Sequence, residues 1–204
     1  PPILTLVSPE AGYVTTNTPA VTWTAQDNAG GSGIDPDSAM VKLDGKAVPA
    51  EQVSVTVGAG GTYTITYTPG AALAEGPHTV QAGISDNDGN TATMEANYIV
   101  DTVPPALSAL LSFEGVVVDA YTVTITGQSN DATAPPVTMT VMDNGAAAGA
   151  PEVRPDGRFS FLLNLEVGEN HITVTATDRA GLTTTASYYI IRMVTDRTQA
   201  DVDA

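Results

Sequence analysis

The sequence predicts an all-β chain made of two antiparallel β-sandwich domains in tandem. Three observations predict this fold: apolar and polar residues alternate along many short segments, turn residues separate these segments, and the whole pattern occurs twice. Threonine, valine, alanine and glycine dominate the 204 residues, and aromatic residues make up only 5%. Threonine and valine favour strands, and glycine favours turns. We expect no membrane insertion, because no run approaches the roughly 18 apolar residues of a membrane helix.

The alternating positions define the expected strands. A half-buried antiparallel strand directs every second side chain towards the core. In the first half the expected core sets are Val21/Trp23/Ala25, Val41/Leu43, Tyr63/Ile65/Tyr67 and Val80/Ala82/Ile84. In the second half they are Tyr121/Val123/Ile125, Val137/Met139/Val141, Phe159/Phe161/Leu163 and Ile172/Val174/Ala176. Turn pairs such as Asp44-Gly45 and Asn144-Gly145 separate these segments at a spacing typical of sandwich strands.

The two halves also align with each other. Residues 86–93 match residues 178–185, and the strand positions upstream of them match as well. A repeat of about 100 residues is the length of a whole sandwich. Pro104-Pro105 interrupts the strand pattern, because proline cannot donate a ladder hydrogen bond. We therefore expect domains at residues 1–103 and 104–194.

A polar tail is expected at residues 195–204. Thr198-Gln199-Ala200-Asp201 fits the start of a helix, in which a hydroxyl and a carboxylate cap free N–H groups. The alternatives are a frayed tail, which is favoured, and the first turn of a helical module.

Motifs of the first half carry a resemblance to a known family. They are residues 27–35 (Asp-Asn-Ala-Gly-Gly-Ser-Gly-Ile-Asp), residues 41–45 (Val-Lys-Leu-Asp-Gly) and the segment 76–90 from Gly-Pro-His-Thr-Val to Asp-Asn-Asp-Gly-Asn. In this order they resemble bacterial immunoglobulin-like repeats of surface adhesins and large extracellular enzymes. The closing residues 100–105 (Val-Asp-Thr-Val-Pro-Pro) are similar to the junctions of such arrays. The resemblance implies immunoglobulin-like sandwiches in an extracellular or cell-surface bacterial protein.

The second half resembles the accessory domains of glucodextranase-type and other cell-wall-associated proteins. Residues 156–161 (Asp-Gly-Arg-Phe-Ser-Phe) and 168–178 (Gly-Glu-Asn-His-Ile-Thr-Val-Thr-Ala-Thr-Asp) carry this similarity. Such domains serve as stalks, spacers and adhesive tips alike, so the resemblance implies a fold and a cellular context without a ligand.

The charge balance excludes two classes of partner. The net charge is −16, with 23 acidic and 7 basic side chains. Such a surface repels phosphate backbones and anionic lipid headgroups, so we expect no nucleic-acid partner. The chain has no cysteine, which excludes disulfides, thiol catalysis and thiolate metal sites.

Residues suited to catalysis are few, so we do not expect an enzyme. His78 and His171 are the only side chains that titrate near neutral pH without a large pKa shift. They occupy near-equivalent positions at the start of the same repeated strand, and a repeated position of this kind favours a structural role.

Calcium is the candidate cofactor, although none is required. Asp86, Asp88 and Asn90 place oxygen atoms at alternate positions of a short loop, as a hard cation prefers. The twelfth position is Asn97 rather than glutamate, so the loop is not an EF-hand. Aspartate, asparagine and glycine are also the residues that a hairpin turn requires, and this interpretation is favoured.

A second acidic group consists of Asp27, Asp35 and Asp37, in and beside a glycine-rich loop. These three carboxylates are a further candidate calcium site. The alternative is a solvated loop in which the glycines permit tight curvature, and this alternative is again favoured.

Sugar binding would require exposed aromatic rings. The adjacent Tyr188 and Tyr189 must point to opposite faces of a strand, so one of them is expected at the surface. Trp23, the only tryptophan, alternates with Val21 and Ala25 and is therefore expected in the core rather than at a binding face.

These observations favour a non-catalytic structural or spacer segment that presents the flanking domains of a bacterial surface or secreted protein. Two sandwiches in series would make a rod of about 80 Å, judged from ordinary strand lengths. One alternative is a glycan-binding accessory module of a secreted glycoside hydrolase, and another is an adhesive domain that binds a host surface protein.

Overall fold

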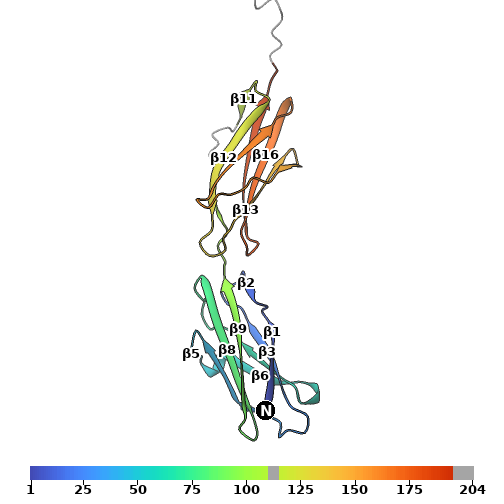
Figure 1. Ribbon diagram of the computed structural model, residues 1–204, viewed down its shortest axis with the longest axis vertical. Coiled ribbons are helices and arrows are strands. Elements are labelled where there is room, and N and C mark those ends of the chain that lie inside the picture. Colours follow the sequence, from blue (N-terminus) through green and yellow to red (C-terminus); the bar gives the residue numbers. More distant parts are fainter. Residues whose placement is uncertain (110–114, 195–204) are drawn as a thin grey trace, which may run out of the picture. The chain divides into compact units, whose positions relative to one another are not determined.

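The computed structural model describes residues 1–109 and 115–194, and it divides the chain into two compact units (Figure 1). Unit 1 is Pro1–Thr102 and unit 2 is Val103–Ala204, and we call them domain 1 and domain 2. The expected polar tail and helix start at residues 195–204 lie outside the described residues. The fold is all-β, as predicted. Within the described ranges no helix has the length and apolar character needed to cross a membrane.

Domain 1 is a sandwich of two sheets. The first sheet has the strand order β1 (Pro2–Ser8), β3 (Val21–Asp27), β7 (Tyr63–Tyr67), β6 (Val53–Val57). The second has the order β2 (Gly12–Val14), β9 (Thr91–Val100), β8 (Gly76–Asp86), β4 (Ile34–Leu43), β5 (Lys46–Ala47). The strand β2 pairs in parallel with β9, and the other paired strands run antiparallel. Two short 3₁₀ turns, η1 (Ala50–Gln52) and η2 (Ala59–Gly61), flank β6.

Domain 2 repeats this arrangement with fewer described strands. One sheet has the order β10 (Ala106–Ala109), β12 (Thr122–Asn130), β15 (Arg158–Asn164). The other has the order β11 (Val116–Val118), β17 (Thr183–Arg192), β16 (Gly168–Thr177), β13 (Thr138–Asp143), β14 (Ala146–Gly149). The strand β11 pairs in parallel with β17, as β2 does with β9.

The same tight turn joins β4 to β5 and β13 to β14. Asp44 and Gly45 have φ values of 48° and 79°, and Asn144 and Gly145 have φ values of 50° and 79°. Two successive residues in the left-handed region form the hairpin turn whose twist matches that of the strands, and Asp-Gly and Asn-Gly adopt it readily. The sequence signal for these turns is therefore confirmed.

Each domain has its own hydrophobic core. In domain 1 the core surrounds Trp23, which is 0% exposed, so the prediction for the single tryptophan is confirmed. A buried tryptophan removes about 150–250 Å² from water, which stabilises the fold by about 4–6 kcal/mol. The other fully buried large side chains of this core are Tyr67, Ile65, Ile84, Val21, Val80 and Val100.

The core of domain 2 contains nearly all of the predicted apolar positions. Ile125, Leu165, Ile172 and Ile190 are 0% exposed. The expectation for Tyr121 was wrong, because it is 55% exposed and precedes β12, which begins at Thr122. The Arg192 guanidinium carbon lies 5.0 Å from the Tyr121 ring centroid, so the ring forms a surface cation–π contact instead.

Candidate functional site

The acidic turn between β8 and β9 is held together by its own side chains. Asp86 is 3% exposed, and its Oδ1 accepts hydrogen bonds from the backbone N–H of Asp88 at 3.0 Å and of Asn90 at 2.8 Å. The Asn90 side-chain amide donates to Asp86 Oδ2 at 2.8 Å. These hydrogen bonds, the one from the Asn90 side chain foremost, outweigh burial and hold the pKa of Asp86 below its usual value. Local turn formation therefore accounts for Asp86 and Asn90, and calcium binding by this turn stays a prediction.

The structure separates Asp27 from Asp35 and Asp37. Asp27 ends β3, and its two carboxylate oxygens accept hydrogen bonds from the backbone N–H of Asn28 and Gly33, each at 2.8 Å. Asp35 lies on β4, where its Oδ1 accepts from the backbone N–H of Asp37 at 3.1 Å. Among the described residues these three carboxylates do not form a group with oxygens within 4.8 Å of one another.

Asp27 lies instead near Asp86. The backbone nitrogen of Pro1 is 3.7 Å from Asp27 Oδ1 and 3.6 Å from Asp86 Oδ2. The side chains of both aspartates are largely buried, at 7% and 3% exposure. Two buried carboxylates of domain 1 therefore lie close to each other.

Domain 2 has a comparable pair of carboxylates. Asp178 follows β16 at the position that aligns with Asp86, and Asp131 follows β12 much as Asp27 ends β3. A carboxylate oxygen of Asp131 lies within 4.8 Å of one of Asp178. Asp131 Oδ1 accepts hydrogen bonds from Thr133 N at 2.8 Å and Ala134 N at 2.6 Å.

One oxygen of this pair has no hydrogen-bond partner. Asp178 is 6% exposed, and its Oδ1 accepts from Leu182 N at 2.9 Å, whereas its Oδ2 is buried and unbonded. A buried charged oxygen is costly without a partner, so it is a natural ligand for a hard cation. Sequence reasoning missed Asp131. The repeat could have indicated it, because Asp131 follows β12 much as Asp27 ends β3, and Asp178 aligns with Asp86.

The two adjacent tyrosines face opposite sides of β17, as the strand geometry requires. Tyr188 packs partly against the core of domain 2, and burial raises its pKa. Tyr189 is 37% exposed, and its ring centroid lies 6.4 Å from that of His171. With Tyr121, domain 2 therefore presents two exposed tyrosine rings, one of which sequence reasoning had assigned to the core.

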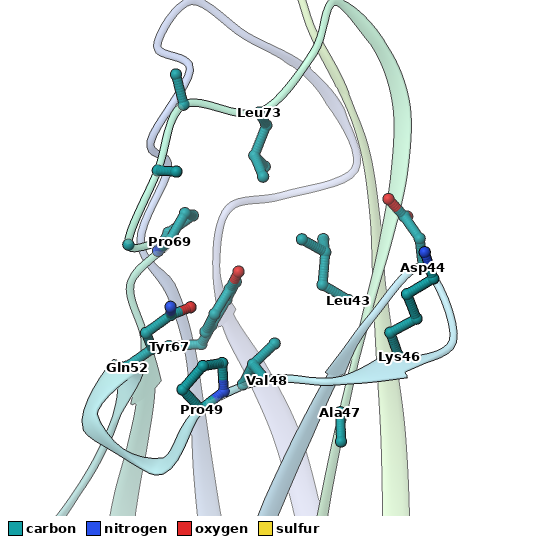
Figure 2. Close-up of a pocket in the computed structure, with 13 residues that line it drawn as sticks. Leu43, Asp44, Lys46, Ala47, Val48, Pro49, Gln52, Tyr67, Pro69 and Leu73 are labelled. Carbon is teal, nitrogen blue, oxygen red and sulfur yellow. The ribbon is translucent and has the colours of Figure 1, made fainter.

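A pocket of about 450 Å³ opens in domain 1, and sequence reasoning did not detect it (Figure 2). Apolar side chains make up most of its lining: Leu43, Val48, Pro49, Pro69 and Leu73. Figure 2 shows the Tyr67 hydroxyl pointing into this space, with Gln52 on one side and Asp44 and Lys46 on the other. A mostly apolar pocket with a few polar groups is typical of small-ligand sites. The pocket depends on how residues 68–75 fold back over the sandwich, which no strand pattern reveals.

Comparisons with known proteins confirm the expected resemblance for both halves. Residues 15–102 match the model of the bacterial Ig-like domain, and residues 105–193 match that of glucodextranase, domain B. No curated protein sequence matches the chain significantly.

Solved structures of tandem modules share the fold. The fibronectin(III)-like modules of Clostridium thermocellum CbhA are 16% identical, with a TM-score of 0.55, and the match covers 97% of this chain and 98% of that chain. An I-band fragment of titin is 15% identical, with a TM-score of 0.60, over 94% of this chain and 65% of that chain. At these identities the likeness shows the immunoglobulin and fibronectin(III) type of fold alone.

Proposed function

We propose that the chain is a non-catalytic structural segment of a bacterial cell-surface or secreted multidomain protein, in which it spaces and presents the flanking domains. The observation that carries this proposal is the presence of two self-contained sandwiches, each closed around its own core. A module with this organisation can be added to a protein without support from its neighbours. The bacterial Ig-like family of domain 1, usually found outside the cell or on its surface, supports the proposed location.

Small-angle scattering of the full chain tests the spacer proposal. A spacer in which the two domains stand in series should give a maximum dimension of about 80 Å. A maximum dimension close to that of a single domain would refute the spacer proposal, because two domains folded against each other cannot separate their neighbours.

Calcium is proposed as a stabilising ligand of the acidic ends of the domains. The unbonded Asp178 Oδ2 beside Asp131 supports this in domain 2, and the Asp27–Asp86 pair supports it in domain 1. A ligand that binds only the folded state at a hundredfold excess over its Kd adds about 2.7 kcal/mol of stability. Calorimetry of the full chain in calcium and in chelator should therefore show an upward shift in Tm.

Two variants show which domain the calcium-dependent shift in Tm belongs to. Asp178→Asn should abolish the calcium-dependent shift of the domain 2 transition, and Asp86→Asn that of the domain 1 transition. The comparison is made between calcium and chelator for each variant, so that any loss of intrinsic stability cancels. Equal melting curves for the unmodified chain in calcium and chelator would reject the metal proposal and leave the spacer proposal untouched.

Glycan binding is the second candidate function. The exposed rings of Tyr121 and Tyr189 favour it, because sugars stack on aromatic faces, and domain 2 matches the glucodextranase domain B model. Retention of the chain on insoluble polysaccharides should fall in Tyr121→Ala and Tyr189→Ala. Tyr13→Ala, on β2 of domain 1 and outside its core cluster, is the control for an unspecific loss of an aromatic ring. Equal retention of all three variants would exclude these rings as a binding platform. A host surface protein remains the third proposed partner.

A further inference from the structure

His78 bridges two separate segments of domain 1. It lies near the start of β8, and its Nδ1 is 2.8 Å from Asp44 Oδ2, in the turn that follows β4. Its Nε2 is 3.0 Å from the carbonyl oxygen of Ala74, in the loop of residues 68–75 that joins β7 to β8. The side chain of His78 is only 11% exposed, whereas that of Asp44 is 47% exposed, so solvent reaches the contact from the Asp44 side.

These two segments form opposite walls of the domain 1 pocket. Asp44 and Lys46 line one wall, and residues 69–73 line the other (Figure 2). The loop is also fixed by a hydrogen bond from Leu73 N to the carbonyl oxygen of Asn17 at 2.8 Å. Ala74 directly follows Leu73, the last loop residue that lines the pocket. His78 therefore connects the two walls at the base of the loop.

Both atoms that face the imidazole ring are hydrogen-bond acceptors. A carboxylate accepts only, and a backbone carbonyl accepts only, so both ring nitrogens must carry a proton to bond both of them. Only the imidazolium form has two N–H groups. Loss of one proton leaves one acceptor facing a nitrogen lone pair, and either the link to Asp44 or the link to Ala74 is lost.

The electrostatic environment agrees with this geometry. Burial lowers the pKa of His78, but the hydrogen bond to Ala74 and the hydrogen bond and charge of Asp44 outweigh it and raise the pKa above 6.5. The other titratable groups around this ring lie on β5, β7, β9 and the loop itself: Lys46, Tyr67, Tyr98 and Glu75. Glu75 is engaged with the backbone N–H and hydroxyl of Thr102, and Lys46 acts on the charge of Asp44.

Domain 2 contains the same framework with an asparagine in place of the histidine. Asn144 occupies the turn position of Asp44, and its Oδ1 accepts from His171 N at 3.0 Å, as Asp44 Oδ1 accepts from Thr79 N at 2.9 Å. The side chain of His171 is 65% exposed and contacts Glu169 of its own strand at 2.7 Å. His171 therefore corresponds to Thr79, and the counterpart of His78 is Asn170, whose amide bonds the backbone of Glu166 four residues before it, as His78 bonds Ala74. Domain 2 thus holds its equivalent loop with a side chain that does not titrate.

We propose that protonated His78 is a clip that holds the loop of residues 68–75 against the Asp44 turn, and that loss of its proton releases this loop, which forms one wall of the domain 1 pocket. The pocket is complete while the clip is made, so a ligand should bind it in a pH-dependent manner. The proposal concerns domain 1 alone and is independent of the spacer and calcium proposals.

The pH window of the clip follows from its two groups. His78 has a raised pKa in the closed form, so its contribution is full below 6.5 and is lost as the pH rises through the raised value. Burial raises the pKa of Asp44, but hydrogen bonds from Thr79 and His78 and nearby positive charge lower it below 3.8, so its contribution is present above 3.8 and is lost in stronger acid. The clip is therefore complete between pH 3.8 and pH 6.5.

Hydrogen exchange and histidine titration by NMR on the full chain test the clip. The exchange protection of the Leu73 amide reports loop closure, and the Leu165 amide, bonded to the carbonyl oxygen of Tyr121 at 2.8 Å, is the domain 2 reference. Protection is corrected for the intrinsic pH dependence of exchange. For each pKa unit by which loop closure raises the pKa of His78, loss of the His78 proton lowers the ratio of closed to open loop tenfold. Leu73 protection should therefore fall across the His78 titration, whereas Leu165 protection stays constant.

Three variants complete the test. His78→Gln has no titrating ring, so Leu73 protection should be independent of pH, whereas His171→Gln should leave Leu73 unchanged. Asp44→Asn is a second route should His78→Gln not fold, because Asn144 shows that asparagine fits this turn. In Asp44→Asn the titration of His78 should move to lower pH. Constant Leu73 protection across the His78 titration, or a His78 pKa no higher than 6.5, would overturn the proposal.

Discussion

The hydroxyl of Tyr98 gives a quantitative test of the domain 1 core. Tyr98 lies on β9, is 2% exposed, and its hydroxyl is buried without a hydrogen-bond partner. A buried polar group in this state costs about 1–3 kcal/mol. Tyr98→Phe removes the hydroxyl and keeps the ring, so we expect the free energy of unfolding of domain 1 to rise by about 1 kcal/mol. For a domain of this size the Tm should rise by about 4–8 °C.

The only tryptophan makes this change measurable in one domain. Trp23 is buried in the same core as Tyr98, so its fluorescence reports the unfolding of domain 1. Urea titrations should show a higher midpoint with an unchanged slope, because the surface exposed on unfolding is nearly the same. Tyr121→Phe is the matched control, since that ring is 55% exposed in domain 2. A lower midpoint for Tyr98→Phe would refute the reasoning, because it would mean that the hydroxyl makes a stabilising hydrogen bond.

Four further results are expected. Burial raises the pKa of Tyr98 to about 12 from 10.0, so domain 1 should lose stability as the pH rises between these values. Tyr98→Phe should reduce this alkaline loss in urea titrations and leave the part due to Tyr67, whose pKa burial also raises. Trp23→Ala should destabilise domain 1 by about 3–5 kcal/mol and leave the calorimetric transition of domain 2 in place. Gly127→Ala should destabilise domain 2 by about 1–3 kcal/mol, because the new Cβ would lie 2.5 Å from Phe159 Cζ. Unfolding followed by circular dichroism should show this loss, whereas unfolding followed by Trp23 fluorescence should not change. The pKa of Asp86 is lowered from 3.8, so its contribution is present above 3.8 and is lost as the pH falls through the lowered value. Asp86→Asn should therefore weaken the acid dependence of the Trp23-detected midpoint below pH 3.8.

The alternation of apolar residues predicted the cores well because a strand has a fixed period of two. Trp23, Val80 and Val174 are all 0% exposed, as the pattern required. The pattern failed for Tyr121 because a period says which face a residue shares, but not where a strand begins. Tyr121 lies one residue before β12, where its ring contacts Arg192.

The candidate sites were less predictable than the cores because they depend on which strand ends meet. The sequence grouped Asp27 with Asp35 and Asp37, which are close in the chain, whereas the fold brings it near Asp86 from another sheet. Asp131 and Asp178 meet in the same way. The role of His78 was equally hidden, because its two partners, Asp44 and Ala74, belong to a turn and a loop whose meeting no strand pattern reveals.

The parallel pairing of β2 with β9, and of β11 with β17, has a mechanical consequence. In each domain the first of these strands lies near the entry of the chain and the second near its exit. Tension applied to the two ends of a domain pulls parallel strands past each other along their length. The hydrogen bonds between them are then strained together in shear, whereas an antiparallel hairpin pulled open at its free end breaks its bonds one after another. Each domain should therefore resist stretching more strongly than its free energy of unfolding alone implies.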